Sequence, residues 1–438
     1  MHNVKRLVGT TVGKSLRQAT RLRKGAGQAL PGLVVERLLP DYYAKMLQQL
    51  PEGVVVVTGT NGKTTTTKMV VELLRANGKR VLTNPTGSNL TRGINSMLIH
   101  QATVRGELPF DIAVLELDEA YARLFARRVA VRWVLALNVM RDQLDRFGEV
   151  DTAGGMIAET MAQAQEGIVT NANDRRLLPA AQEIVANNPN LMLKLFGVAD
   201  DLLGHFPQDD ELVSVTHKKP AAASAASGQR PDVQLVRFAG QEAAYAVAAD
   251  ASADTTEHEG VFMLSGQHNF QNAAAAAALA MALLPRVEPA AIMRQLRAIK
   301  PAFGRGEVFR LPNGSTLRMI LVKNPAGFRQ GLASYLPATA PVMIAINDRI
   351  ADGRDMSWLW DVDFTPLREA TIFCTSGVRA ADMALRLQYD DVAVERVEPR
   401  LSSALQDYCR LPGDKLLFTT YTAMLKMHAI LKQEAEVV

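Results

Sequence analysis

A glycine-containing turn between an apolar strand and an amphipathic helix carries the clearest chemical signal in the sequence. Residues 54–65 have the sequence VVVVTGTNGKTT. Gly59 and Gly62 allow the backbone to close around phosphate oxygens, so that amide N–H groups and the helix N-terminus face the anion. Lys63 adds a positive charge for the transferred phosphate, and the Thr64 hydroxyl can ligate magnesium. The turn is shorter than the usual GxxxxGK(S/T) loop, but its position predicts a phosphate-binding loop.

A carboxylate follows a later apolar run, at Glu116 in the stretch IAVLELDE over residues 112–119. A carboxylate that leaves a buried strand beside a phosphate-binding loop is well placed for the second protein contact of a magnesium ion. The alternative is an ordinary exposed acid at a strand end, and the same stretch supplies two further acids. We expect Mg²⁺ to be held by Thr64 and Glu116.

The elements that must position these residues follow an α/β pattern. Strands are expected at residues 54–57, 81–82, 112–117, 134–137 and 167–170. A second set of strands is expected at residues 316–321, 342–346, 371–374 and 416–419, with a helix at 380–387. Apolar, β-branched runs that alternate with helix-length segments are typical of a mainly parallel, doubly wound sheet buried on both faces.

The length of 438 residues is enough for two or three domains. We expect a basic helical segment over residues 1–50, a central phosphate-binding domain over 51–308 and a Rossmann-like C-terminal α/β domain over 309–438. Residues 200–260 break the rhythm of strands and helices, because they include an Ala/Ser/Pro-rich stretch with few bulky apolar side chains. They predict a flexible insertion, with regular structure resuming at Val261.

Composition narrows the class of protein. Apolar residues make up 48% and charged residues 21%, which excludes a disordered, collagen-like or coiled-coil chain. The longest apolar run, residues 273–284, is shorter than the about 20 residues of a membrane-spanning helix, so none is expected. The cysteines, Cys374 and Cys409, cannot form a disulfide framework or a four-cysteine zinc site. Their small number favours a reducing, cytoplasmic location.

The net charge of +4 is unevenly distributed. Residues 1–35 contain seven basic and no acidic residues, and the rest of the chain has 42 basic against 45 acidic residues. The body is therefore close to neutral, and nucleic-acid binding is not indicated. Within residues 1–24, apolar positions recur at helical spacing between the basic ones. Three interpretations of this amphipathic helix stay open: docking on its own domain, peripheral contact with anionic lipid, or a mitochondrial-type presequence.

The phosphate-binding loop and a later element together resemble the Mur ligase family, ATP-dependent enzymes that activate a carboxylate as an acyl phosphate. The loop residues that match the family's P-loop are Gly59, Thr60, Asn61, Gly62, Lys63, Thr64 and Thr65. Residues 266–272, GQHNFQN, match the family's GxHNxxN element at the start of an alanine-rich helix. The resemblance implies ATP and Mg²⁺, with Asn272 in contact with the adenine and Asn269 supporting it. An HNxxN pattern alone is also compatible with a helix N-cap. The match to the family therefore depends on the position of this element after the P-loop in the chain.

Two further segments match the same family. Residues 171–174, NAND, resemble the segment after the strand beside the nucleotide, which implies a nucleotide contact for Asn171. Arg305, in the stretch FGRGE, matches the arginine that reaches the γ-phosphate and the acyl phosphate. An unpaired loop arginine is the alternative interpretation of Arg305.

The sequence also departs from the family pattern at two places. Gln143 stands where many members have a histidine that helps to hold a second magnesium ion. No lysine occurs between Lys79 and Lys194, so the family's carbamylated lysine has no counterpart. Because of these departures, the family's usual site for a second magnesium ion is not predicted here. They also leave open whether the incoming nucleophile is an amino acid.

Three segments narrow the resemblance to one branch. They are RDQLDRFGE at residues 141–149, KNPAG at residues 323–327 and NDRIADGRDMSW at residues 347–358. They closely resemble the MurT family, the synthetase subunits of lipid II isoglutaminyl synthase, and the resemblance extends from about residue 30 to the C-terminus. It implies amidation of the α-carboxylate of D-glutamate in the stem peptide of lipid II. The ammonia would come from a separate glutaminase subunit, GatD.

The cysteines agree with a separate source of ammonia. Glutamine cleavage needs a cysteine nucleophile on a sharp turn with a histidine nearby. Cys374 lies in a strand-like stretch and Cys409 in a helical one, so both are expected to be buried and structural. In the family, the synthetase subunit supplies an aspartate that orients the histidine of the partner's Cys–His pair, and the matching residue is Asp355. Spacing alone leaves Asp348 and Asp352 as alternatives.

Lys323 has two interpretations. It assists Arg305 in stabilising the charge on the transferred phosphoryl group, or it is a surface lysine.

Many MurT proteins carry a four-cysteine zinc ribbon, but residues 200–260 contain no cysteine, so no zinc is expected. A lipid-linked substrate would make the basic N-terminal segment a candidate contact with the inner membrane face. The rival functions are an amino-acid-adding Mur or folylpolyglutamate-type ligase and a nucleotide-binding scaffold without catalysis.

Overall fold

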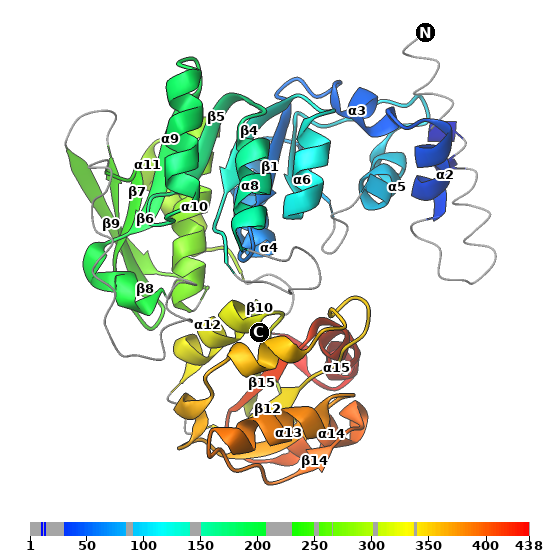
Figure 1. The fold of residues 1–438 in the computed structure, drawn as a ribbon, viewed down its shortest axis with the longest axis vertical. Coiled ribbons are helices and arrows are strands. Elements are labelled where there is room, and N and C mark those ends of the chain that lie inside the picture. The colour runs from blue at the N-terminus through cyan, green and yellow to red at the C-terminus, as the bar shows by residue number, and fades with distance from the viewer. Residues whose placement is uncertain are drawn as a thin grey trace.

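The chain folds into two α/β lobes, each built on its own sheet (Figure 1). The computed structural model describes residues 10–11, 13–14, 30–84, 91–140, 150–206, 230–248, 254–264, 266–300, 305–336 and 340–437. Among these residues, no helix is long and apolar enough to cross a membrane.

The first sheet forms the centre of the upper lobe in Figure 1. In the described residues its strand order is β2 (Val81–Leu82), β3 (Ile112–Glu116), β1 (Val54–Thr58), β4 (Val131–Ala136), β5 (Ala164–Asn171), β6 (Met192–Val198), β7 (Val233–Ala239), β8 (Glu242–Ala248) and β9 (Thr255–Val261). From β2 to β7 every neighbouring pair is parallel. The expected parallel α/β sheet is thereby confirmed.

Helices cover both faces of this sheet, which explains why β1 is an uninterrupted run of buried residues. On one face lie α4 (Lys63–Ala76), α10 (Gln267–Leu283) and α11 (Pro289–Arg297), together with η1 (Asp200–His205). On the other lie α2 (Leu30–Leu38), α3 (Tyr42–Leu47), α5 (Thr91–Gln101), α6 (Glu119–Ala126), α8 (Val150–Met161) and α9 (Leu177–Asn187). Successive valines of β1 alternate between the two cores, with Val55 and Val57 in the first and Val54 and Val56 in the second.

The described parts of residues 200–260 form regular structure, where the sequence predicts a flexible insertion. β7 pairs with β6, and β8 and β9 extend the sheet in antiparallel fashion. Regular structure therefore resumes at Val233 and not at Val261. The strands lack a strong apolar signal because β8 is largely alanine and β9, at the sheet edge, is polar and mostly exposed. Residues 207–229 and 249–253 lie outside the described residues.

The second sheet forms the lower lobe in Figure 1. In the described residues its order is β14 (Val397–Glu398), β13 (Ile372–Ser376), β12 (Val342–Ala345), β15 (Lys415–Thr419), β11 (Thr316–Leu321), β10 (Arg305–Arg310) and β16 (Glu436–Val437). One face carries α12 (Pro325–Tyr335), η3 (Ser357–Asp361), η4 (Thr365–Leu367) and α13 (Ala380–Tyr389). The other carries α14 (Leu401–Arg410) and α15 (Tyr421–Glu434).

The pairing within the second sheet is mixed. The strands from β14 to β11 are parallel, whereas β10 runs antiparallel to both β11 and β16. Because β10 begins at Arg305 and belongs wholly to this sheet, the second lobe starts before the boundary predicted at residue 308.

The N-terminal residues that the structure describes dock on the first lobe. The hydroxyl of Thr10 hydrogen-bonds the Tyr42 hydroxyl at 2.8 Å, and Nζ of Lys14 donates to the carbonyl of Ala102 at 2.5 Å. This part of the segment therefore follows the docked interpretation. Residues 1–9, 12 and 15–29 lie outside the described residues.

Candidate active site

The turn between β1 and α4 has the backbone of a phosphate-binding loop. Gly59 and Gly62 have φ angles of 131° and 85°, in the left-handed region that favours glycine. α4 begins at Lys63, so its first N–H groups, which have no partner within the helix, lie next to the turn. β1 lies between β3 and β4, and all three are parallel, so the turn stands at the carboxyl edge of the sheet. This is the position at which parallel α/β sheets bind ligands.

Lys63 folds back over its own loop. Its Nζ donates to the carbonyl oxygens of Gly59 and Thr60, the latter at 3.1 Å. It also lies 3.6 Å from Oε2 of Glu119, a buried acid in the first turn of α6. Only 11% of the Lys63 side chain is exposed, so its charge is held close to the loop. The sequence supplied Glu119 only as a neighbour of Glu116, with no role assigned.

The predicted metal ligands lie side by side. The hydroxyl of Thr64 donates to Oε1 of Glu116 at 2.8 Å. Asn84 holds the Glu116 backbone, because its side chain accepts from the N–H and donates to the carbonyl, both at 2.9 Å. A hydroxyl and a carboxylate are hard oxygen donors that fit Mg²⁺ with phosphate and water as its other ligands. The described residues contain no group of three or more His, Cys, Asp or Glu for a metal, and residues 141–149, with Gln143, lie outside them.

The segment after β4 is hydrogen-bonded to the phosphate-binding loop. The N–H of Asn61 donates to Oδ1 of Asn138 at 2.9 Å, and Nδ2 of Asn138 donates to the Asn61 carbonyl at 3.1 Å. The Thr60 N–H donates to the Asn138 carbonyl at 3.0 Å. The Thr60 hydroxyl exchanges hydrogen bonds with the backbone of Met140 at 3.0 and 3.2 Å. Sequence reasoning assigned no role to Asn138, although it fixes the shape of the loop.

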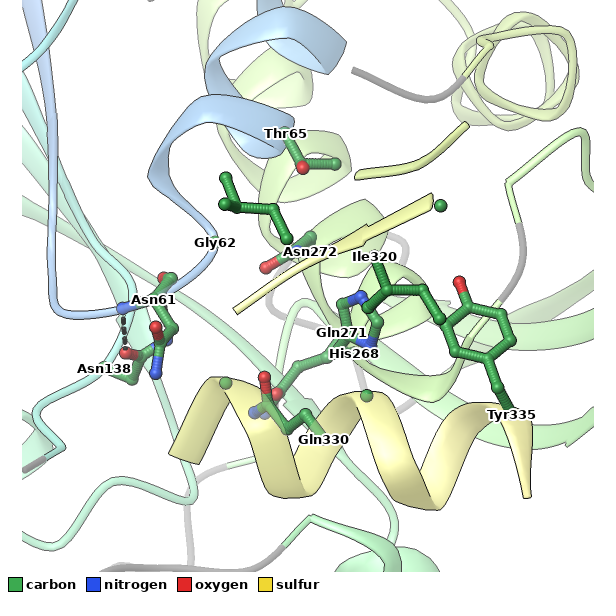
Figure 2. A pocket seen from close by; sticks show the side chains of 14 residues that line it. Asn61, Gly62, Thr65, Asn138, His268, Gln271, Asn272, Ile320, Gln330 and Tyr335 are labelled. Atoms are coloured by element: carbon green, nitrogen blue, oxygen red, sulfur yellow. Dashed lines mark hydrogen bonds between the residues drawn. The ribbon is translucent and has the colours of Figure 1, made fainter. Parts of the chain in front are cut away.

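A pocket lies between the phosphate-binding loop, α10 and α12. Figure 2 shows Asn272 of α10 close to Gly62, and Gln330 and Tyr335 of α12 on the opposite side. The pocket therefore joins the loop of the first lobe to a helix of the second.

The loop and the GxHNxxN element, far apart in sequence, meet at this pocket. A Cβ on Gly62 would lie only 2.3 Å from Oδ1 of Asn272, so the approach of α10 requires glycine there. His268 lines the pocket and hydrogen-bonds Ser334 of α12 through Nδ1 at 3.2 Å. Asn269 is 2% exposed and does not line the pocket, which agrees with a supporting place behind Asn272.

Substitution of Gly62 by alanine tests this close approach. We expect Gly62→Ala to weaken nucleotide binding about tenfold or more, since the new methyl group meets Asn272 and the left-handed φ costs alanine about 1–2 kcal/mol. Isothermal titration with a non-hydrolysable ATP analogue measures the change. Gly78→Ala is the matched control, because Gly78 has a φ of 83° with nothing within 4 Å of the added Cβ. Equal affinities for the two variants would contradict the prediction.

The segment after β5 shapes the edge of the sheet. Oδ1 of Asn171 accepts from the N–H of Asn173 at 3.0 Å, and Asn171 does not line the pocket. Asp174 follows β5, and its carboxylate accepts from the N–H of Val139 in the segment after β4 and from the N–H of Leu177 at the start of α9, both at 2.9 Å. Burial raises the pKa of Asp174. A nucleotide contact for Asn171 stays a prediction.

The two predicted cations of the second lobe have different surroundings. Arg305 is the first residue of β10, where it pairs with Ile320, and its side chain lies outside the described part. The next residue, Gly306, lines the pocket. Lys323 is exposed between β11 and α12 and does not line the pocket. The roles of Arg305 and Lys323 toward phosphate stay predictions.

The loop after β12 holds the three predicted acids in different environments. Asp348 pairs with Arg379 at 2.8 Å. Asp352 is 5% exposed and accepts from the N–H and the hydroxyl of Thr422, at 2.7 and 2.5 Å. Both acids are therefore engaged within the second lobe.

Asp355 differs from these two acids. It is half-buried, and its Oδ1 accepts from the N–H of Ser357 at 2.8 Å. Hydrogen bonds from the backbone and side chain of Ser357 lower the pKa of Asp355, so it is a carboxylate at neutral pH. No ion-pair partner of Asp355 lies within the described parts of the chain. Asp355 is thus the acid of this loop that is available to a group from outside.

Neither cysteine has the surroundings of a nucleophile. Cys374 is fully buried on β13 and donates to the carbonyl of Thr375, and burial raises the pKa of its thiol. Cys409 is half-buried on α14, and burial raises the pKa of its thiol to about 11. Both surroundings agree with the expected structural role.

These pKa shifts predict slow alkylation of the native chain. At pH 8, a thiol with a pKa of about 11 is roughly one part in a thousand thiolate, far less than a free cysteine. We expect iodoacetamide to label Cys409 at least about a hundredfold more slowly than a model peptide, with the rate rising as the pH approaches 11. Mass spectrometry of the intact chain gives the rates. Labelling at the peptide's rate would show that the thiol is activated.

Comparison with known protein families gives one match in each lobe. The model of the Mur ligase middle domain matches residues 57–280, and the model of the MurT ligase C-terminal domain matches residues 321–424. The lipid II isoglutaminyl synthase (glutamine-hydrolyzing) subunit MurT of Streptococcus pneumoniae is 29% identical over 465 aligned positions, covering 98% of this chain and 97% of that protein.

Solved structures show the same fold. MurF from Acinetobacter baumannii superimposes with a TM-score of 0.65 at 18% identity, over 92% of this chain and 80% of that one. MurF from Thermotoga maritima, solved in complex with ADP, has a TM-score of 0.63 at 16% identity, over 91% of this chain and 84% of that one. Both lobes and their order are thus shared with these ligases.

Proposed function

The chain belongs to the MurT branch of the Mur ligase family, and from this premise we propose that it is the synthetase subunit of a lipid II isoglutaminyl synthase. It uses ATP to convert the α-carboxylate of D-glutamate in the stem peptide of lipid II to the amide. The observation that carries the proposal is the similarity to a MurT subunit over 98% of the chain. The phosphate-binding loop in one lobe and Asp355 in the other support it.

The first step is activation of the carboxylate. A carboxylate oxygen of the substrate attacks the γ-phosphorus of ATP, and ADP leaves. The N–H groups at the start of α4 and the ammonium of Lys63 face the phosphates and stabilise the charge that develops there. Glu119, 3.6 Å from the Lys63 ammonium, keeps that charge in place. In this proposal Arg305, with Lys323, steadies the transferred phosphoryl group.

Thr64 and Glu116 would hold Mg²⁺ beside the phosphates. When bound, the ion neutralises charge on the phosphate oxygens. The short contact between the Thr64 hydroxyl and the Glu116 carboxylate supports this pair as ligands. Asn84 keeps Glu116 in position through its backbone.

The second step is amide formation. Ammonia attacks the acyl carbon of the acyl phosphate, inorganic phosphate leaves, and the nitrogen loses a proton. The thiols of Cys374 and Cys409 are unsuited to release ammonia from glutamine, because burial raises the pKa of both. We therefore assign ammonia release to a GatD-like glutaminase subunit. Asp355 would complete that subunit's Cys–His pair by accepting from Nδ1–H of the histidine.

Reconstitution tests the proposed function. The chain is mixed with a GatD-like glutaminase, glutamine, ATP and lipid II, and the product is weighed by mass spectrometry. The expected change is that of a carboxylate becoming an amide. A mass increase by an amino-acid residue would instead identify an amino-acid-adding ligase. An unchanged substrate mass with intact nucleotide binding would favour the scaffold.

A lipid-linked substrate gives the basic N-terminal segment a role in peripheral membrane contact. We propose that Arg17, Arg21, Arg23 and Lys24 rest near anionic headgroups, each worth about 1 kcal/mol. Changing these four residues to glutamine should reduce cosedimentation with phosphatidylglycerol vesicles. The control changes two exposed lysines of α15, Lys426 and Lys432, to glutamine. Equal cosedimentation of all three proteins would remove the proposed contact.

A further inference from the structure

Helix α12 contacts both the phosphate-binding loop and the segment that carries Asp355. Its N-terminus reaches the loop through Asn324, and its inner face packs on η3, which begins two residues after Asp355. Figure 2 shows α12 lying across the pocket, opposite the loop. Both contacts are direct and lie within the first turns of α12, so a displacement of the loop has a short physical route to Asp355.

Asn324 makes the first contact of this route. Its Nδ2 donates to Oδ1 of Asn61 at 3.2 Å, and its Oδ1 accepts from the N–H of Gly327 at 2.7 Å. The orientation of the amide follows from the second bond, since the N–H of Gly327 requires an oxygen as its acceptor. Asn324 is only 1% exposed, and its bond to Asn61 is partly buried. One side chain therefore caps α12 and holds the loop.

Asn61 lies where binding of phosphate would act on the loop. Its backbone is held by Asn138 on one side, and the adjacent Gly62 is in contact distance of Asn272. The backbone of this turn is the part of a phosphate-binding loop that closes on the anion. A change in its shape moves the Asn61 side chain and the bond to Asn324 with it.

Phe328 makes the second contact of the route. It is fully buried, with ring centroids 6.4 Å from Trp358 and 5.0 Å from Phe364. Trp358 belongs to η3, and the N–H of Ser357 at the start of η3 holds Oδ1 of Asp355 at 2.8 Å. Close-packed interiors transmit small shifts because they contain few voids. A shift of α12 is therefore passed to the backbone that orients the Asp355 carboxylate.

We propose that α12 couples nucleotide binding in the first lobe to the orientation of Asp355 in the second, with Asn324 as the positioning residue. The inference rests on the proposed function, because it takes Asp355 to serve a partner's histidine. It goes beyond that function in assigning a signal: glutamine is hydrolysed fastest when the synthetase site holds nucleotide. Ammonia is then released fastest when the nucleotide that activates a carboxylate is bound.

The test measures glutamine hydrolysis in the assembled complex with and without a non-hydrolysable ATP analogue. In the wild-type complex we expect the analogue to raise the rate about fivefold or more, the usual size of coupling between sites. Asn324→Ser keeps a side chain that caps α12 but does not reach Asn61. It should keep the rate without nucleotide and lose the increase. Phe328→Leu, which removes the ring contact with Trp358 one turn further along α12, should also reduce the increase.

Two controls separate coupling from damage to the fold. Ala333→Ser, at an exposed position of α12, should keep the full response. Thermal melting of each variant verifies that the second lobe is folded. A wild-type rate that does not respond to nucleotide, or a full response in Asn324→Ser, would overturn the coupling. Product mass from lipid II is read for the same proteins in parallel samples that contain ATP in place of the analogue, so a failure of the proposed function is distinguished from a failure of the coupling.

Discussion

Replacement of Lys63 by alanine is expected to lower ATP-dependent amidation of lipid II by about a hundredfold or more. The ammonium stands at the start of α4, within 3.6 Å of the Glu119 carboxylate and in contact with carbonyls of its own loop. In the proposed reaction this ammonium faces the transferred phosphoryl group. Loss of one preorganised group of this kind costs about 10²–10³ in rate in other enzymes.

Lysine is also difficult to replace by arginine at this position. Only 11% of the Lys63 side chain is exposed, and two backbone carbonyls and Glu119 surround the ammonium. A planar guanidinium is larger and has a different donor geometry. We therefore expect Lys63→Arg to recover little of the lost activity, in contrast to a surface lysine.

Amide formation is measured by the mass of lipid II after incubation with the glutaminase subunit, glutamine and ATP. Lys68→Ala is the matched control on the same helix, because Lys68 pairs with Glu72 on its surface at 3.5 Å. It should retain the wild-type rate. Unchanged amidation by Lys63→Ala would mean that the loop does not act in catalysis, and the scaffold function would then be favoured.

The phosphate-binding loop was predictable because its residues are consecutive. One short stretch contains the strand, both glycines, Lys63 and the start of the helix, and each has a preference that local sequence expresses. The parallel strands were predictable for a similar reason, since burial on both faces produces uninterrupted apolar runs such as β1. Strands β8 and β9 were missed because alanine and polar edge residues do not form such runs, and in β7 polar residues interrupt the apolar ones.

The residues that hold the loop were not predictable from spacing. Asn84 and Asn138 act on residues 32 and 77 positions away, and Asn324 acts on a residue 263 positions away. An isolated asparagine near a strand end resembles many turn residues. Its role follows only from the neighbours that the fold brings to it. The same is true of Asp348, Asp352 and Asp355, whose spacing left their roles open and whose partners now distinguish them.

Asp355→Asn is expected to lower glutamine hydrolysis by the assembled complex by up to about 10⁴-fold. The change keeps the size of the side chain and the oxygen that accepts from Ser357. It removes the negative charge that would fix the histidine tautomer and stabilise the imidazolium, and an equivalent change in a Ser-His-Asp triad has about that cost. Asp352→Asn acts differently, because Asp352 is bonded to Thr422 and its loss disturbs the loop itself.

Asp363 provides a matched control for Asp355. Its Oδ1 accepts from the N–H of Thr365 at 2.9 Å, the same two-residue turn that Asp355 makes with Ser357, and it is exposed. Asp363→Asn should therefore leave glutamine hydrolysis unchanged. Amidation with added ammonium chloride gives a second readout. If Asp355 serves only the glutaminase, Asp355→Asn keeps this ammonia-driven reaction while it loses the glutamine-driven one. Loss of both would place Asp355 in the synthetase reaction or in the stability of the second lobe, and full glutamine hydrolysis would exclude it from the shared triad.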